Sequence, residues 1–324
     1  MSDTDAPPAK RARTDEDASE TPITRSKIWY KDGSVVLQAS STQFRVHFGV
    51  LAEHSTVFKD MYELPQPDDS GLTVEGCPLV QLDDDPAELR RLLLVLYNPL
   101  KLSEAISFSY VAALVRLGRK YAFTALLKAG VQRILEDYPS NLAHFDALKD
   151  KPPPHILWYH GLEFDILALC QEMGIRTVLP YVYYRILTYP REEWVMGSKR
   201  PSGTIAMLSR ENLRVCLLGD YLVTRTQLQP DYTLGWLLTP PTPSCRTSTK
   251  CMQDRCKTHR WLMRIEPDAI CGLLPRTLDD WIKRQCEACK TELKPLLQSG
   301  REKAWTNLPS FFELPPWNEL TNDV

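Results

Sequence analysis

The hydrophobic period of the chain changes near residue 47, and this change limits the folds that its first third can adopt. Residues 26–47 mix β-branched and aromatic side chains with two turn signals, KDG at 31–33 and SST at 40–42. This pattern predicts a β-hairpin with Phe44 and Val46 on one face. Helical spacing follows at 48–62, a short strand at 77–82, and helical spacing again at 85–97 and 109–135. This order of strands and helices predicts a compact α+β domain.

Length and charge bound the rest of the chain. With 324 residues we expect two or three folded units, and a formal net charge of −2 indicates no global preference for nucleic acid or an anionic membrane. No stretch reaches the roughly 18 apolar residues of a membrane span, and the charged first residues are not a signal peptide. We therefore expect a soluble intracellular protein, nuclear or cytoplasmic, that does not bind membranes.

The first 25 residues have almost no large apolar side chains, so they are predicted to be disordered. Within them, KRAR at 10–13 is either a nuclear-import signal or a solvated charge run.

Residues beyond 138 are predicted to be mainly helical. Two apolar stripes recur at helical spacing, Leu162, Ile166, Leu169 and Met173 before a stop signal at Gly174, and then Val178, Val182 and Ile186. TPPTPS at 239–244 marks a linker or turn. The expected order is a disordered tail at 1–25, a first domain at 26–138, a helical domain at 139–235, and a cysteine-containing helical unit at 236–324.

The first domain contains sequence blocks in a specific order. They are FRVHFGVLAEHSTVFKDMY, then VQLDDDPAELRRLLLVLY, then LVRLGRKYAFTALL. The positions that carry the pattern are Phe44, Val46, His47, Val50, Leu51, Ser55, Phe58, Met61, Leu96, Tyr97 and Tyr121. On these residues the chain resembles the BTB/POZ domain over about 26–138, and its overall style is similar to the BTB proteins found in large numbers in mushroom-forming fungi.

This resemblance implies a non-catalytic protein–protein interaction module that forms a homodimer or binds a protein partner. BTB proteins often serve as adaptors for cullin-type ubiquitin ligases, and others act in transcription. The cullin-binding subgroup often has an apolar residue, any residue and Glu after the helix that carries Phe and Met, and 61–63 is loosely similar to that pattern. The chain departs from the family at Gly33 and Phe48, where family members often have an Asp and a basic residue. The resemblance therefore does not extend to the charged groove of BTB repressors.

Cysteine and histidine concentrate near the C-terminus. Nine cysteines in a chain without a signal peptide fit reduced thiols. The candidate metal ligands in this part of the chain are Cys245, Cys251, Cys256, His259, Cys286 and Cys289. Short-spaced pairs separated by tens of residues are typical of structural zinc sites. We predict one structural zinc held by Cys245, Cys251, Cys286 and Cys289, with Cys256 and His259 as alternates.

A second interpretation of the same residues is a helical core. The capping box at 277–280 predicts a helix from Leu278, in which Ile282, Cys286, Cys289, Leu293 and Leu296 form one buried stripe. Met252, Cys256, His259 and Met263 form a similar stripe in the preceding helix. A redox sensor that uses Cys286 and Cys289 is a further alternative, and it requires accessible thiols of low pKa.

Catalytic motifs are absent from the sequence. It contains no glycine-rich phosphate loop, no G-x-S-x-G and no H-E-x-x-H, so we do not expect an enzyme. The basic residues of 245–264 are either a solvated helix face or a contact for nucleic acid, and the second reading supports a nuclear regulator as the alternative function. The closing aromatic residues, Trp305, Phe311, Phe312 and Trp317, are expected to pack on the chain's own core.

Overall fold

The computed structural model describes residues 22–64, 72–148, 155–262, 274, 280 and 282–324. Its residues divide into two units, one from 1–48 and 65–86 and the other from 49–64 and 87–324. Several predictions lie outside the described residues: most of the tail at 1–25, the import cluster at 10–13, the first three residues of the capping box at 277–280, and Met263.

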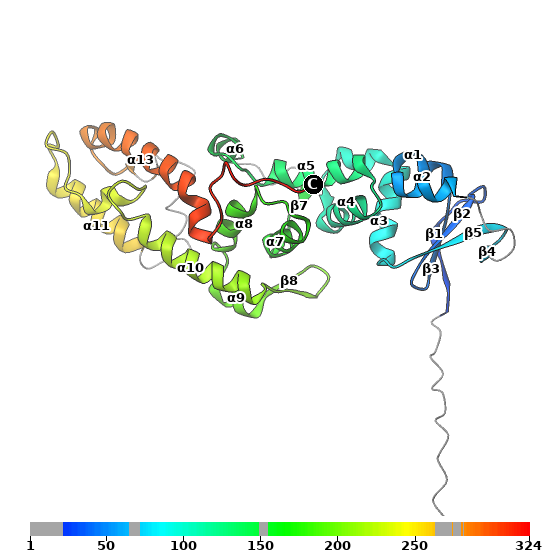
Figure 1. The fold of residues 1–324 in the computed structure, drawn as a ribbon. Helices are drawn as coiled ribbons and strands as arrows, with labels where there is room; N and C mark the ends of the chain where they lie inside the picture. The colour runs from blue at the N-terminus through cyan, green and yellow to red at the C-terminus, as the bar shows by residue number, and fades with distance from the viewer. Residues whose placement is uncertain (1–21, 65–71, 149–154, 263–273, 275–279, 281) are drawn as a thin grey trace, which may run out of the picture. The chain divides into compact units, whose positions relative to one another are not determined.

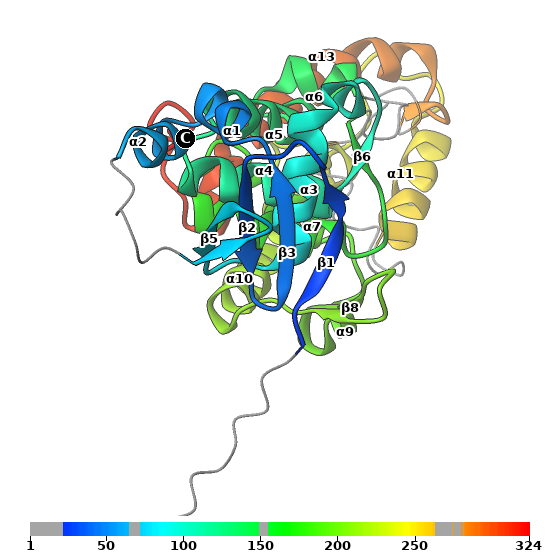
Figure 2. The same cartoon turned by 90° about the vertical axis from the view of Figure 1, so that its right-hand side faces the viewer.

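The first unit is built on a five-stranded sheet in the order β1-β3-β2-β5-β4. Figure 2 labels four of its strands, β1, β2, β3 and β5. Its strands are β1 (Thr24–Trp29), β2 (Val35–Ala39), β3 (Thr42–Val46), β4 (Thr73–Val74) and β5 (Cys77–Leu82). Two pairs are antiparallel, β2 with β3 and β4 with β5, while β1 pairs with β3 and β2 with β5 in parallel. Phe44 and Val46 are both buried, as the period of two predicts.

The predicted hairpin over 26–47 is confirmed for its second half and wrong for its first. β2 and β3 form the hairpin, with Val35 opposite Val46 and the left-handed Ser40 in the turn. β1 does not pair with β2 across the KDG turn, because its partner is β3 on the far side of the hairpin. The turn signal was present, since the Gly33 amide donates to the Tyr30 carbonyl, but the chain crosses over instead of folding back.

The second unit is mainly helical (Figure 1). Its first elements are α1 (Phe48–His54, from the unit boundary), α2 (Thr56–Glu63), α3 (Pro86–Tyr97), η1 (Pro99–Ser103), β6 (Ile106–Ser107), α4 (Phe108–Lys120), α5 (Thr124–Asp137) and α6 (Leu142–Ala147). Then follow β7 (Ile156–Leu157), α7 (Leu162–Met173), α8 (Leu179–Ile186), α9 (Arg191–Met196), β8 (Ser198–Lys199), β9 (Ile205–Ala206) and α10 (Arg210–Thr226). The last are η2 (Gly235–Leu238), α11 (Ser248–Leu262), α13 (Glu287–Asn307) and η4 (Leu308–Phe312). The expected α+β start and helical continuation are confirmed.

One large apolar core runs through this unit from α3 to η4. The stripe predicted in α7 is buried, and Gly174 ends the helix in the left-handed conformation, as its stop signal predicts. The closing aromatic residues belong to the same core: Trp305, Phe311 and Phe312 are buried, and Trp317 stacks on Trp305 with ring centroids 5.3 Å apart. Their predicted packing on the chain itself is therefore confirmed.

A second, smaller core surrounds the cysteine segment. It comprises Leu234, Trp236, Leu237, Cys251, Leu262, Ile282, Cys289, Leu293 and Leu297. Over the described residues this core is much smaller than the first one, and cross-links such as a bound metal ion are a common way to stabilise a small core. Among the described residues, no helix combines the length and apolar character needed to cross a membrane.

Candidate metal centre

Four cysteines reach one point from three segments of the chain. Cys245 lies after the proline-rich turn at 239–244, Cys251 lies in α11, and Cys286 and Cys289 lie at the start of α13. Cys286 has extended backbone angles and is the N-cap of α13, which directs the first turn of that helix toward the other cysteines.

The four sulfur atoms lie at metal-binding distances. All four Sγ atoms lie within 4.8 Å of one another, and those of Cys245 and Cys286 are 3.5 Å apart. In a tetrahedral site with Zn–S bonds of about 2.3 Å, neighbouring sulfurs stand about 3.8 Å apart, which this range includes. The donor set is all sulfur, which favours Zn²⁺ over a hard cation such as Mg²⁺. These four residues can therefore hold a metal ion.

Burial and the helix terminus give the thiols different acidities. The backbone N–H of Cys289, assisted by the neighbouring thiols, lowers the pKa of Cys286 to about 6. Burial raises the pKa of Cys289 to about 12. The thiolate form is therefore favoured at Cys286 and disfavoured at the buried Cys289, where a bound cation would stabilise it.

Arg255 joins the segments that carry the cysteines. Its buried guanidinium group donates to the carbonyl oxygens of Trp236, at 2.9 Å, and Thr239, at 2.8 Å, both upstream of Cys245. Its Nε donates to Oε1 of Gln285 at 3.2 Å, and Gln285 Nε2 donates to the carbonyl of Cys251 at 3.2 Å. These bonds hold the polypeptide on either side of the ligands in place.

Arg255 and Gln285 were missed as site residues, because Arg255 was counted with the basic patch. The available signal was spacing, since Arg255 is one turn after Cys251 on the same helix face and Gln285 directly precedes Cys286. Thr247 was also missed; its Oγ1 lies 3.4 Å from the sulfur of Cys251.

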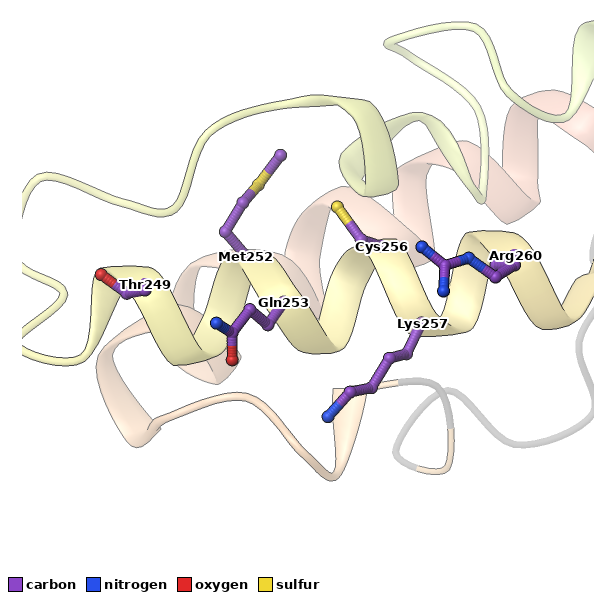
Figure 3. A pocket seen from close by; sticks show the side chains of 6 residues that line it. All are labelled: Thr249, Met252, Gln253, Cys256, Lys257 and Arg260. Carbon is purple, nitrogen blue, oxygen red and sulfur yellow. The ribbon is translucent and has the colours of Figure 1, made fainter.

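The alternate ligands lie away from the four sulfurs. Cys256 is exposed and His259 half-buried, and neither belongs to the group of convergent ligand atoms. Cys256 lines a pocket of about 390 Å³ on the outer face of α11, together with Thr249, Met252, Gln253, Lys257 and Arg260. In Figure 3, Met252 and Cys256 point to one side of the helix and Gln253 and Lys257 to the other.

Both helical stripes predicted for this region are corrected by the structure. Met252 and Cys256 are exposed, whereas Cys251, Arg255 and Leu262 form the buried face of α11. α13 begins at Glu287 after turns at 283–285, so Cys286 is not inside a continuous helix with Ile282. Leu296 is exposed, and Leu297 is buried in its place. Because Cys289 is fully buried, the accessible pair that a redox sensor requires is not present.

Three positions of the family pattern in the second unit form one contact set. Ser55 is the N-cap of α2: its Oγ accepts from the amide of Phe58 at 3.0 Å and donates to the carbonyl of Tyr121 at 2.5 Å. The rings of Phe58 and Tyr121 lie 5.2 Å apart. The pattern therefore joins the start of α2 to the end of α4 across 66 residues.

The remaining pattern positions lie in several elements. Leu51 and Leu96 are buried in α1 and α3, Tyr97 ends α3 and is half-buried, and Met61 is half-buried near the end of α2.

In the first unit, His47 follows β3, with its Nε2 3.3 Å from Oδ2 of Asp32 and its ring 5.3 Å from that of Tyr30. Asp32 and His47 thus contact each other although the expected Asp position is occupied by Gly33.

Comparison with known families tests the resemblance. The model of the BTB/POZ domain matches residues 30–137, about a third of the chain and nearly the range expected from the sequence. A search of curated proteins finds no match to this chain, so the resemblance to the fungal BTB proteins stays a prediction. The chain contains a BTB/POZ domain, a non-catalytic protein–protein interaction fold, at residues 30–137.

Proposed function

We propose that this protein is a non-catalytic interaction scaffold in which the BTB/POZ domain mediates homodimerisation or partner binding, and in which one structural zinc ion holds the region around α11 and the start of α13. The observation that carries the proposal is the domain match at 30–137, supported by the contact set of Ser55, Phe58 and Tyr121. The domain boundaries at 138 and 235 are part of this proposal.

The zinc proposal is supported by the convergence of four sulfurs beside a small core. Zn²⁺ would supply the positive charge that keeps four neighbouring thiolates together. The chain's own contribution is to place the ligands through the Arg255 and Gln285 bonds and to bury Cys289. Because the part of this core that the structure describes has few apolar residues, we expect metal binding to contribute directly to its folding free energy.

Native mass spectrometry of the full-length protein, combined with elemental analysis, tests both parts of the proposal. We expect one zinc per chain and a dimer mass. Cys289→Ser should abolish zinc binding, whereas Cys256→Ser, in the same region but exposed, should retain it. A folded wild-type chain without metal would refute the zinc site and leave the BTB-based proposal intact. A chain that is monomeric and binds no partner protein would refute the scaffold.

Within this class, we propose an adaptor role for a cullin-type ubiquitin ligase. The exposed apolar side chains of Tyr62 and Leu64 at the end of α2 support it, because they adjoin the cullin-like pattern at 61–63. Titration calorimetry with a purified cullin N-terminal domain should show binding that Tyr62→Ala combined with Leu64→Ala weakens. Ile205→Ala, an equally exposed apolar position in β9, is the control. No binding to the wild-type chain would eliminate the adaptor role.

A second candidate function, a nuclear regulator that contacts nucleic acid, is supported by the exposed stripe of Arg246, Lys250, Lys257 and Arg260 along α11 and the residues before it. Phosphate contacts by such a stripe would give affinity that falls steeply with salt. A gel-shift titration with duplex DNA at increasing salt tests this, with Lys250→Glu and Arg260→Glu as variants. Absence of binding at low salt would eliminate this candidate.

A further inference from the structure

Helix α10 is apolar on two opposite faces. One face carries Val215, Cys216, Gly219 and Val223, which are buried as the helix packs on η4 and α8. The opposite face carries four large side chains in its central turns, and they remain exposed: Leu217 by 50%, Leu218 by 41%, Tyr221 by 57% and Leu222 by 37%. Adjoining exposed apolar side chains of this size are uncommon on a helix surface, so the second face indicates a surface that another helix or chain contacts.

The charges that flank this apolar face have a two-fold pattern around Leu218. Glu211 lies about two turns before Leu218, and Arg225 lies about two turns after it, on the same side of the helix. Both side chains are exposed, and each contacts a neighbour on its own helix, Arg214 for Glu211 and Tyr221 for Arg225. Two antiparallel copies of α10 that cross at Leu218 would place each Glu211 beside an Arg225 of the other copy.

The same crossing places unlike side chains of the inner turns in contact. Arg214 lies about one turn before Leu218, and Tyr221 and Leu222 about one turn after it. In an antiparallel pair, the Arg214 stem would cover Leu222 of the second copy, while its guanidinium group stays paired with Glu211 and Glu313 of its own chain. A parallel pair would instead place Glu211 beside Glu211 and Arg225 beside Arg225, which costs free energy. The charge pattern therefore selects a second copy in the antiparallel orientation.

We propose that the exposed face of α10 is a second self-association surface, which pairs antiparallel with α10 of another copy of the chain about a two-fold axis at Leu218. This surface lies outside residues 30–137, so it is separate from any association through the BTB/POZ domain. A contact of one helix per copy is at the small end of stable interfaces, so it adds to the association of the BTB/POZ domain and does not replace it.

Sedimentation equilibrium of the full-length chain over a range of concentrations tests the proposal. Leu218→Glu should weaken self-association by about tenfold or more, because it places two carboxylates together on the axis. Glu211→Arg and Arg225→Glu should each weaken association, since each creates two like-charge contacts. The double variant should restore association, because the guanidinium group introduced at one position would face the carboxylate introduced at the other position of the second copy. Leu238→Glu, exposed outside α10, should have no effect.

Cross-linking gives the geometry independently. A Leu218→Cys chain should form an intermolecular disulfide under mild oxidation, because the two thiols would face each other at the axis. Thr224→Cys and the wild-type chain measure the background from other cysteines. Unchanged association of Leu218→Glu would overturn the proposal and leave the BTB-based association unaffected. Weakening by the single charge variants without recovery in the double variant would also overturn it, because Glu211 and Arg225 of two copies would then not face each other.

Discussion

Arg255 has a different role in the structure from the one that its sequence context suggests. In the sequence it is one of several basic residues between 245 and 264, most of which are exposed. In the structure it is buried, with its guanidinium carbon 5.4 Å from the ring centroid of Trp236 and its donors on three backbone carbonyls and Gln285. Its guanidinium group holds the chain around the cysteines, so it cannot contribute to a surface patch.

Replacing Arg255 by Met should destabilise the chain by about 2–4 kcal/mol, because the buried carbonyl oxygen of Trp236 and the partly buried bonds to Thr239 and Pro240 would lose this donor. Urea unfolding followed by tryptophan fluorescence measures the loss. Arg260→Met, on the exposed side of the same helix, should change stability by less than about 0.5 kcal/mol. Equal effects of the two variants would show that the buried bonds contribute nothing.

At the scale of elements, two helical glycines differ in how closely other parts of the chain approach them. Gly300 lies in α13, and a Cβ at this position would stand 2.7 Å from the backbone carbonyl carbon of Tyr232 and 2.8 Å from the amide nitrogen of Thr233. Gly49 lies in α1, and a Cβ there would meet nothing within 4 Å. The intrinsic helix preference for Ala over Gly is the same at both sites, so packing decides the sign of a substitution.

Gly49→Ala should therefore stabilise the protein by about 0.5–1 kcal/mol, because it reduces the freedom of the unfolded chain without a clash. Gly300→Ala should destabilise it by about 1–3 kcal/mol, since a backbone neighbour cannot move aside as a flexible side chain can. Thermal unfolding by circular dichroism gives both values. A stabilising Gly300→Ala would mean that α13 does not lie against residues 232–233 as described.

The described residues of the second unit form a large core and a smaller one. The large one extends from α3 to η4 and includes the buried faces of α7 and α8. The small one surrounds the four cysteines, and η2, α11 and the first half of α13 contribute to it. Since unfolding free energy varies across a structure with the buried apolar contacts of each part, the two cores should respond differently to metal removal.

Removal of the proposed zinc with a chelator should raise hydrogen exchange in 234–262 and 282–297, with little change in α4, α7 and α8. The physical reason is that four unpaired thiols would leave the small core without its cross-link, whereas the large core keeps all its contacts. Exchange measured by mass spectrometry, before and after zinc is added back, gives the result by segment. An equal response in both cores, or none in either, would contradict the role of the metal as a local staple.

Local pattern alone determined much of this protein. Apolar spacing located α3, α4, α5 and α7, and family blocks located the BTB/POZ domain, because helical periodicity and short motifs are encoded by residues close in the chain. The four cysteines were also chosen by type and spacing. Sequence could not select the strand that pairs with β1, since parallel pairing joins segments whose meeting depends on the path between them.

The tertiary structure alone decided which sulfurs converge and which basic side chain is buried. Cys251 and Cys256 are only five residues apart, but Cys251 is buried in a core that includes residues of α13, whereas Cys256 is exposed. Because α13 begins at Glu287, Cys286 is the N-cap of that helix and lies beside Cys245, instead of belonging to a continuous helical stripe. Which sulfurs converge and which side chains are buried depends on contacts between residues tens of positions apart. The free energy of these contacts cannot be inferred from any short segment of the sequence.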